Sequence, residues 1–412
     1  MIGLSPLSTD LVAAKRKFFQ GNTKYAYSNC KSKKYRTSAS CTIYGSAFSP
    51  NLSGKTYLVA CTSNGLICVW DSKGATTEPI IRVEASVAGK VLYDVQFIES
   101  SGVFLLVVSG DPGILVYKWS VFLNAMDDHI DDGNVVQLEP ITRFKPHQSP
   151  SDAFEPVEIN CTSYSAVDDY LYGGAGDAFG CYQWDMRSEK LVGTFGGAGN
   201  RCNGHNDYLH DVLSIPNNNN LVLTAGEDGA IAFWDGKQRK LIEMMNVQNT
   251  LNKNKHSVTW QIQNKGFGST QQWSNGSNLW VSSMERKGDW LAAVGGSESG
   301  NNMSLRSGPS TAGFMATWHL PTRTFNSGCV TRESYNTIAY NQHLDSFVAG
   351  GNDGRVTFWD SATGACTGRS GCTPSMIYAL SCNAASSTMV VGGTGGSLDC
   401  FIERVNALNF TT

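Results

Sequence analysis

A histidine and a carboxylate of the kinds used in catalysis lie within residues 204–235, GHNDYLHDVLSIPNNNNLVLTAGEDGAIAFWD. His205 and Asp228 are of the types that serve as general base and orienting acid in a charge-relay site. Such a site also needs a positioned nucleophile in a cleft, and no G-x-S-x-G or comparable motif occurs. The structural alternative is a buried imidazole that donates to a carboxylate, beside an indole N–H with an acceptor. We therefore expect a scaffold here and no enzymatic activity.

A second segment with possible metal chemistry is the acidic run MDDHIDDG, which contains His129. It lacks the D-x-D-x-D-G spacing with a distal glutamate that a calcium loop uses. The twelve cysteines are scattered, without a C-x-x-C pair or a Cys/His cluster at zinc spacing. We expect a solvated acidic loop and reduced, buried thiols, and we expect no metal and no cofactor.

The composition of the chain suggests which secondary-structure elements position these residues. The chain of 412 residues is 41% hydrophobic, contains 43 glycines, and has only 16% charged residues. Abundant glycine with aromatics favours many short strands and tight turns over long solvated helices. No apolar run is long enough for a membrane span, and no cationic start precedes an apolar core at the N-terminus. We expect neither membrane association nor secretion.

One local pattern recurs seven times along the chain. An apolar strand ends in small residues, a turn such as Asp-Gly follows, and a strand of about six residues leads to an aromatic anchor. Asn-Gly and Asp-Gly supply the positive φ that two-residue hairpins need. The seven anchors are Trp70, Trp119, Trp184, Trp234, Trp318, Trp359 and Phe401. Their shortest spacings match a four-stranded propeller blade of about 40–45 residues. The sequence thus predicts an all-β fold, a single seven-bladed β-propeller over residues 41–412.

This pattern resembles the WD-repeat proteins, from residue 41 to about residue 410. The resemblance implies that His205, Thr224, Asp228 and Trp234 form the buried hydrogen-bonded set of one blade. The other blades lack the Gly-His pair, so we expect them to depend on the packing of large aromatic side chains.

Three long insertions and a basic arm depart from a regular repeat. The insertions are expected at about 125–158, 245–288 and 297–312, and all three are rich in polar residues. Residues 1–40 contain eight basic residues and one acidic residue, a net charge of +7, which leaves −10 for the remainder. The arm is either an import signal or phosphate contact, or a solvated terminus. Its candidate RNA contacts are Lys31, Lys33, Lys34 and Arg36.

Three stretches support a closer resemblance. EPVEINC (155–161), GHNDYLH (204–210) and ATWHL (316–320), in this order, resemble the subunit 6 family of the THO complex. These are WD-repeat subunits of a nuclear assembly that couples transcription to mRNA export. The resemblance implies a nuclear, non-catalytic scaffold that docks onto other THO subunits and reaches RNA mainly through them. It implies no small-molecule substrate.

Exposed turn residues beside the predicted inner strands are candidate partner contacts. They are Asp207, Tyr208, Glu227 and Asn352. Ordinary solvated turns are the alternative reading of these residues. A different function also stays open, a WD-repeat substrate receptor of a ubiquitin ligase, because WDMR places Arg187 after a Trp-Asp pair. The sequence leaves open how the ring of blades closes.

Overall fold

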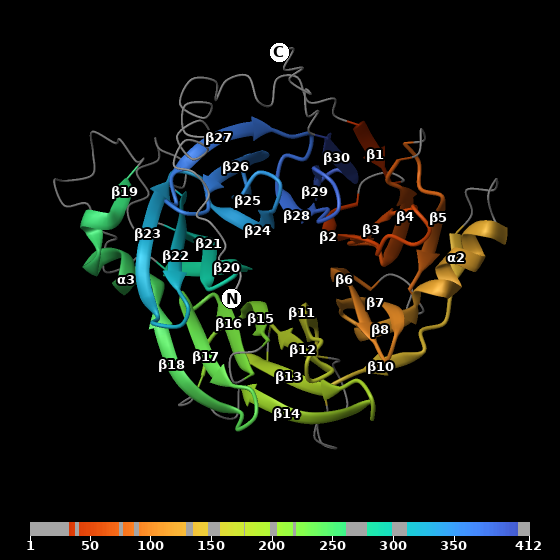
Figure 1. The fold of residues 1–412 in the computed structure, drawn as a ribbon, viewed down its shortest axis with the longest axis horizontal. Coiled ribbons are helices and arrows are strands. Elements are labelled where there is room, and N and C mark those ends of the chain that lie inside the picture. Colours follow the sequence, from red (N-terminus) through yellow and green to blue (C-terminus); the bar gives the residue numbers. More distant parts are fainter. Residues whose placement is uncertain are drawn as a thin grey trace, which may run out of the picture.

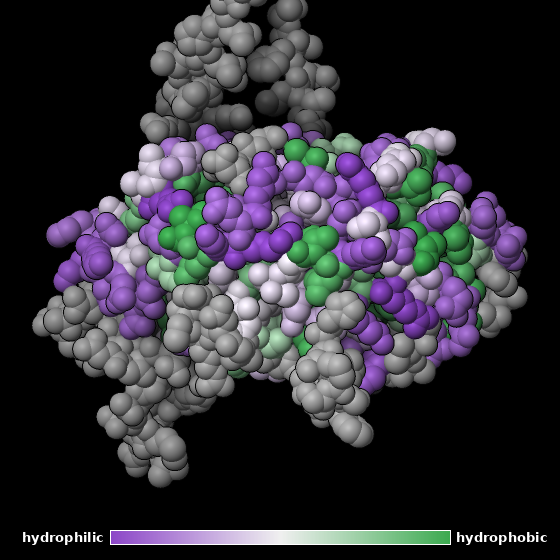
Figure 2. Space-filling view, turned by 90° about the horizontal axis from the view of Figure 1, so that it is seen from below, coloured by the Kyte–Doolittle hydropathy of each residue, from purple (hydrophilic) through white to green (hydrophobic). Residues whose placement is uncertain are grey.

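Seven sheets stand around a central axis like the blades of a propeller (Figure 1), which confirms the predicted all-β fold. The computed structural model describes residues 33–37, 41–73, 77–85, 90–128, 135–146, 157–176, 178–197, 204–216, 220–260, 278–298 and 311–402. Neighbouring inner strands contact one another all the way round, so the ring is closed. Seen edge-on in Figure 2, hydrophobic residues form separate patches among hydrophilic ones.

Each blade has an inner strand beside the axis and further strands outward. From the axis outward, blades one to four consist of β2 (Ile43–Phe48), β3 (Tyr57–Thr62), β4 (Leu66–Asp71) and β5 (Ile81–Glu84); β6 (Leu92–Ser100), β7 (Val103–Gly110), β8 (Gly113–Lys118) and β10 (Thr142–Phe144); β11 (Ile159–Ser165), β12 (Tyr170–Ala175), β13 (Gly180–Asp185) and β14 (Lys190–Gly196); and β15 (Leu209–Ile215), β16 (Leu221–Gly226), β17 (Ala230–Asp235) and β18 (Lys240–Asn246).

Blades five to seven follow the same order. They consist of β20 (Asn278–Lys287), β21 (Trp290–Glu298), β22 (Thr311–His319) and β23 (Thr324–Thr331); β24 (Tyr335–Asn341), β25 (Ser346–Gly351), β26 (Arg355–Asp360) and β27 (Cys366–Gly371); and β28 (Ile377–Cys382), β29 (Thr388–Gly393), β30 (Ser397–Ile402) and β1 (Lys33–Arg36).

The hydrophobic core is divided among the seven junctions between adjacent blades. At each junction the aromatic anchor of one blade packs against the blade before it. Trp234 of blade four, for example, lies edge-on to Phe195 of blade three, with ring centroids 5.9 Å apart. Phe401 has the same place between blades six and seven. A buried aromatic removes about 150–250 Å² from water, so each anchor stabilises a junction as well as its own sheet.

The hairpin turns require glycine for two reasons, which Gly229 illustrates. Its φ is +69°, a left-handed conformation that costs other residues free energy. A Cβ added there would also lie 2.4 Å from the carbonyl oxygen of Leu279 in the next blade. The Asp-Gly pair of the sequence pattern therefore sets both the turn and the close approach of two blades.

The ring closes with a strand from the N-terminal part of the chain. β1 pairs antiparallel with β30, with Lys33 opposite Cys400 and Arg36 opposite Ser397. Just after it, Thr37 Oγ1 donates to the carbonyl oxygen of Gly396 at 2.8 Å. Residues 33–36, which the sequence analysis assigns to the basic arm, thus form the outer strand of blade seven, and both ends of the described chain contribute to one sheet.

The first expected insertion, 125–158, contains regular structure. The helix α2 (Trp119–Asp128) ends inside it and buries Phe122 and Met126 against blades one and two. Next, β9 (Val135–Gln137) adds to the outer edge of blade one in parallel with β5, and β10 then returns as the outer strand of blade two. His129 and residues 147–156 lie outside the described residues.

The other two expected insertions are shorter than their predicted bounds. Residues 278–287 of the second one form β20, the inner strand of blade five. Before it, the helix α3 (Val247–Lys253) buries Val247 and Leu251, the turn η2 (Lys255–Ser257) follows, and β19 (Val258–Trp260) pairs in parallel with β23. The ends of the third, 297–298 and 311–312, pair within the β21–β22 hairpin. Residues 261–277 and 299–310 lie outside the described part of the chain.

Candidate interaction surface

The four side chains expected to form the blade-four set do lie in one hydrogen-bonded chain. The Trp234 indole donates to Thr224 Oγ1 at 2.8 Å, and Thr224 Oγ1 lies 2.8 Å from His205 Nε2. His205 Nδ1 is 3.0 Å from both carboxylate oxygens of Asp228. Every donor finds an acceptor if the imidazole is protonated at Nδ1 and the threonine hydroxyl donates to Nε2.

The hydrogen bonds of this network stabilise the ionised form of Asp228. Burial opposes ionisation, but the hydrogen bond from His205 and those from the backbone N–H groups of Ala230 and Asn206 together hold the pKa of Asp228 below its ordinary value. The same carboxylate accepts from Ala230 N–H in the Asp-Gly turn, at 3.1 Å. Asp228 therefore joins the hairpin turn to the strand entry at His205.

A hydroxyl, an imidazole and a carboxylate are also the groups of a charge-relay site. The burial of these side chains argues against that role, because a substrate could not reach them. Thr224 is 0% exposed and His205 is 1% exposed, so a substrate carbonyl has no approach to the hydroxyl. Thr224 Oγ1 already accepts from the indole of Trp234. Within the described residues, no group of three or more His, Cys, Asp or Glu side chains could hold a metal ion.

The anchors of other blades have different surroundings. The indole nitrogens of Trp119, Trp318 and Trp359 have no hydrogen-bond partner among the described residues. The indole of Trp70 donates to the carbonyl oxygen of Thr77 at 3.3 Å. These four side chains are almost fully buried all the same, so packing area stabilises these anchors more than hydrogen bonding does.

A ring of β-bulges surrounds the channel at one face of the propeller. Each of the seven inner strands skips one residue of its register directly after a buried apolar residue near its start. A bulge leaves its extra residue out of the pairing and turns its side chain away from the sheet. The seven extra residues all line one central cavity and are Tyr44, Tyr93, Asn160, His210, Ser282, Asn336 and Tyr378.

Three of these bulge residues join neighbouring blades. The side chains of Asn160, Ser282 and Asn336 each donate to the carbonyl oxygen that precedes the bulge of the next blade, over 3.1, 2.7 and 3.0 Å. The bond geometry repeats because the bulges repeat at one level of the ring. These polar side chains therefore close the inner edge of the ring and are not free for a ligand.

Two carboxyls lie one residue further along the inner strands. Asp94 Oδ2 accepts from the backbone N–H and hydroxyl of Thr162 in blade three, at 2.9 and 2.6 Å. Asp211 Oδ2 accepts from the N–H of Met284 in blade five, at 2.5 Å. Burial, with the charge of Asp94 as a smaller cause, raises the pKa of Asp211 to about 7, and burial also raises the pKa of Asp94. The two carboxyls are thus structural bridges whose ionised form is disfavoured.

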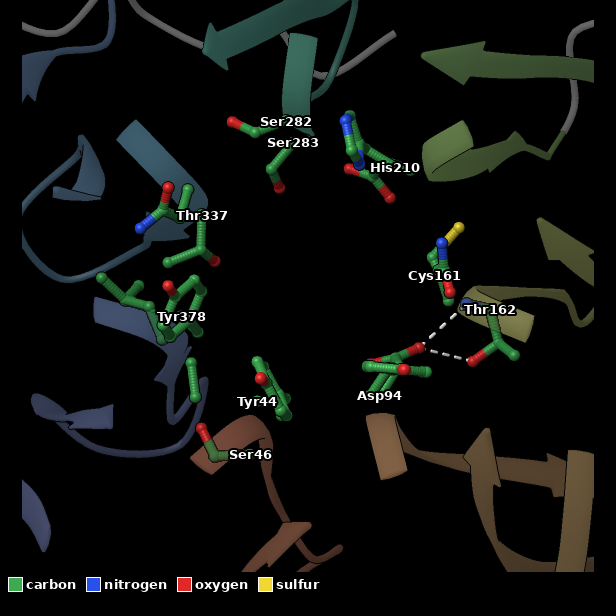
Figure 3. A pocket seen from close by; sticks show the side chains of 17 residues that line it. Tyr44, Ser46, Asp94, Cys161, Thr162, His210, Ser282, Ser283, Thr337 and Tyr378 are labelled. Atoms are coloured by element: carbon green, nitrogen blue, oxygen red, sulfur yellow. Dashed lines mark hydrogen bonds between the residues drawn. The ribbon is translucent and has the colours of Figure 1, made fainter. Parts of the chain in front are cut away.

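The cavity within these rings has a volume of about 200 Å³ and is lined by all seven inner strands. Figure 3 shows the side chains of Tyr44, Tyr378, Asp94, Cys161 and His210 arranged around it, with the Asp94–Thr162 bonds drawn. Burial raises the pKa of the Cys161 thiol well above its ordinary value, so this thiol is a poor nucleophile.

The candidate rim residues occupy the same face as the bulges, since the strand entries and the hairpin turns meet there. Tyr208 is 39% exposed and its ring contacts Phe179. Asp207 is exposed beside it and accepts from the Tyr208 N–H. Glu227 Oε2 lies 2.6 Å from His210 Nε2 of the bulge ring. Asn352 lies apart from these three, in the turn of blade six, where its N–H donates to Ser334 O.

The remaining candidates lie elsewhere in the molecule. Lys33, Lys34 and Arg36 are in β1, at the outer edge of blade seven, and Lys31 lies outside the described residues. Arg187 follows β13 and pairs with the buried carboxylate of Asp169, with Nε and Oδ2 3.2 Å apart. Among the candidates within the described residues, the structure assembles those of blade four into one hydrogen-bonded set.

The bulge residues and the two channel carboxyls were not found by sequence reasoning. A signal for them does exist. Near the start of each inner strand, a buried apolar or tyrosine residue is followed by the bulge residue and then by a small or acidic residue, as in Leu-Tyr-Asp and Leu-His-Asp at 92–94 and 209–211. The bulge interrupts the apolar–polar alternation by which strands are recognised in a sequence. The pattern therefore assigns these positions to ordinary strand ends.

Comparison with known proteins agrees with this geometry. The family model described as WD domain, G-beta repeat, matches residues 197–235, the stretch of blade four. The chain is 26% identical over 337 residues to THO complex subunit 6 of Arabidopsis thaliana, covering 79% of this chain and 74% of that protein. It is 27% identical over 277 residues to the THO complex subunit 6 homolog of Danio rerio, 65% of this chain and 69% of that protein.

A third relative covers less of the chain. THO complex subunit 6 of Drosophila melanogaster is 24% identical over 179 residues, 43% of each chain. The fold, the WD repeat and the three relatives thus point in one direction, a propeller similar to THO complex subunit 6. Neither helix in the described part of the chain has the length and hydropathy to span a membrane.

Proposed function

We propose that this protein is a non-catalytic interaction scaffold and a nuclear subunit of the THO complex, acting there in the coupling of transcription and mRNA processing to mRNA export. The observation that carries the proposal is the similarity to THO complex subunit 6, which extends over 79% of this chain and 74% of the Arabidopsis protein. A likeness over most of both chains extends well beyond one shared repeat.

The site geometry supports the non-catalytic part of the proposal. The one hydroxyl–imidazole–carboxylate set that the structure assembles in blade four is buried, and each of its members has a structural partner. Propellers act through their faces and loops, because the fold itself serves many functions. The bulge ring lies on the same face as Asp207, Tyr208 and Glu227. We assign this face to contacts with partner proteins, which are the other THO subunits.

RNA is reached mainly through those partners in this proposal. The basic residues Lys33, Lys34 and Arg36 would add a direct contact along the outer edge of blade seven. Their position in β1 has a practical consequence, because deleting residues 1–40 would remove the closing strand together with the charges. Charge-neutralising substitutions therefore test an RNA contact more cleanly than a truncation does.

The test is isolation of the tagged full-length protein from nuclear extract, with and without nuclease, followed by mass spectrometry. Recovery of the other THO subunits after nuclease is the expected result, because it requires protein contacts. Recovery of ubiquitin-ligase adaptors in their place, with loss on Arg187→Ala, would favour the substrate-receptor alternative. Absence of THO subunits from both preparations would refute the proposal.

A further inference from the structure

One hairpin turn on the bulge-ring face has a bulky residue where other blades have glycine. The residue five positions before the aromatic anchor is a glycine with positive φ in four blades, namely Gly65, Gly229, Gly354 and Gly396. In blade three it is Phe179, five positions before Trp184, with a φ of +54°. The Phe179 N–H donates to the carbonyl oxygen of Gly176 at 3.3 Å, as the Gly229 N–H does to that of Gly226 at 3.2 Å. Phe179 thus occupies the glycine position of an otherwise similar turn.

The left-handed conformation is costly for Phe179. In this region a Cβ crowds the following carbonyl oxygen, a clash that glycine avoids and that short polar residues tolerate best. The other eight non-glycine residues with positive φ in the described chain are all polar or charged. Core packing does not offset the cost, because the Phe179 side chain belongs to none of the hydrophobic clusters between blades. Backbone strain of this kind collects at binding sites and switches, so Phe179 is a candidate for a role outside the core.

Tyr208 of blade four is the neighbour of the Phe179 ring. The two ring centroids are 6.3 Å apart, with planes inclined by 59°. The Tyr208 ring also lies against the turn itself, since a Cβ added to Gly176 would come within 2.6 Å of its Cδ1 and Cε1 atoms. Tyr208 is 39% exposed, Phe179 is partly exposed, and neither ring lines the central cavity. The two rings form an aromatic pair on the rim, between blades three and four.

Carboxylates border the aromatic pair. Asp207 is exposed and directly precedes Tyr208. The Glu227 N–H donates to the Tyr208 carbonyl oxygen at 2.8 Å, and the Glu227 side chain is 42% exposed. No arginine or lysine of the described chain forms an ion pair with either of these carboxylates. The charge beside the two rings therefore favours a ligand with a cationic group.

We propose that the Phe179–Tyr208 pair is the binding hot spot for an extended segment of another THO subunit, in which an apolar side chain lies beside a lysine or arginine. Exposed aromatic residues contribute much of the binding free energy at protein interfaces. The apolar side chain would cover the two rings, and the cation would meet Asp207 and Glu227. A nucleic-acid base could stack on the rings as well, but the carboxylates would repel its phosphates. The inference rests on the proposed function, because the partner is a THO subunit.

The experiment compares the tagged full-length protein with Phe179→Asn. Asparagine adopts a positive φ far more readily than phenylalanine, so the substitution removes the ring and relieves the backbone. THO subunits recovered from nuclease-treated nuclear extract, measured by quantitative mass spectrometry relative to the tagged protein, should fall about tenfold or more. The urea midpoint of the purified variant should be no lower than that of the unmodified protein. Unchanged recovery would overturn the proposal. So would a lowered midpoint, because the pair would then be a structural contact between two blades.

Glu189→Asn is the matched control. Glu189 is an exposed residue of the same blade with a φ of +56°, and it lies in the turn between β13 and β14 on the opposite face. This variant should recover THO subunits as the unmodified protein does. An equal loss with Glu189→Asn would mean that the effect is not specific to the aromatic pair and would overturn the proposal.

Two further variants test the ring and the charge separately. Tyr208→Ala should lower the recovery of THO subunits about as much as Phe179→Asn, and it keeps the test valid if Phe179→Asn fails to fold. Asp207→Asn should lower recovery about threefold at low salt, and the difference should vanish at high salt, because the contact is electrostatic. Recovery unaffected by Tyr208→Ala would contradict the hot spot, and recovery unaffected by Asp207→Asn would contradict the cationic partner.

Failure of this site and failure of the proposed function are distinguishable. If the unmodified protein and Phe179→Asn both recover THO subunits after nuclease, the scaffold function stands and the aromatic-pair proposal is wrong. If the unmodified protein recovers none, with or without nuclease, the proposed function fails and this inference fails with it. Recovery by the unmodified protein that nuclease abolishes would assign the contact to RNA and overturn the inference as well.

Discussion

The substitution Thr224→Val removes one hydroxyl from the blade-four network and changes little else. Valine has nearly the same shape as threonine, so the substitution leaves no cavity. The hydroxyl is the middle of the chain, 2.8 Å from the indole nitrogen of Trp234 and 2.8 Å from His205 Nε2. Without it, both nitrogens lose that partner in a buried site. The Thr224 carbonyl oxygen lies 3.3 Å from Nε2, but it is an acceptor like the unprotonated Nε2 and cannot replace the hydroxyl.

The expected cost follows from the number of orphaned groups. A buried polar group that loses its partner costs about 1–3 kcal/mol. Two such groups, the indole N–H of Trp234 and the unprotonated Nε2 of His205, give about 2–6 kcal/mol for Thr224→Val. Thr224→Ser keeps the hydroxyl and deletes one methyl group, for about 1 kcal/mol. If the Thr224 hydroxyl stabilises the network, valine should be more destabilising than serine, although valine matches threonine better in shape.

The assay is equilibrium urea unfolding followed by tryptophan fluorescence, with the free energy of unfolding taken from the midpoint and slope. Thr357→Val is the matched control, because this buried threonine has only a long contact, 3.5 Å, to the Tyr335 hydroxyl. It should cost less than about 1 kcal/mol. If Thr224→Val were as stable as Thr224→Ser, the network would not stabilise blade four and the reasoning would fail.

Three further predictions concern other parts of the ring. Burial raises the pKa of Asp211 from 3.8 to about 7, so between these pH values the folded state binds a proton that the unfolded state does not. The free energy of unfolding therefore falls as pH rises from about 4 to 7, by up to about 4 kcal/mol. Asp211→Asn should flatten this pH dependence, measured by urea unfolding at pH 5 and pH 8. Removing residues 1–40 should lower the free energy of unfolding by about 2 kcal/mol, because β30 loses its partner strand; an unchanged urea midpoint would mean that β1 does not hold the ring closed. Replacing Lys33, Lys34 and Arg36 by glutamine should reduce the salt dependence of single-stranded RNA binding, measured by fluorescence anisotropy, by about 0.7 in slope per lost phosphate contact; an unchanged slope would remove the basic residues from RNA binding.

The fold was predictable from the sequence because its signals are local. Each hairpin turn and each aromatic anchor lies within a few residues of the strand that it ends, as in Asp228-Gly229 followed by Trp234. Seven local patterns at blade-like spacing were enough for the architecture. The blade-four set was likewise within reach, because its members lie in one blade of the chain.

The features that were missed depend on pairing between distant residues. Residues 33–36, Lys-Lys-Tyr-Arg, have no apolar alternation, and they become a strand only because β30 leaves an edge open some 360 residues later. β10 is shorter still, with three residues, and is recognised only by its pairing with β8. The hydrogen bond from the Met284 N–H to Asp211 joins two blades. The sequence around either residue therefore gives no sign of this bond.

The central claim, that the bulge-ring face of this propeller binds THO partners, is tested most directly by hydrogen–deuterium exchange. The purified protein would be compared with the same protein in a nuclease-treated THO assembly. The account predicts added protection at residues 204–208 and 227–229, at the strand entry and turn of blade four. Protection confined to the opposite face, or exchange unchanged in the assembly, would contradict it.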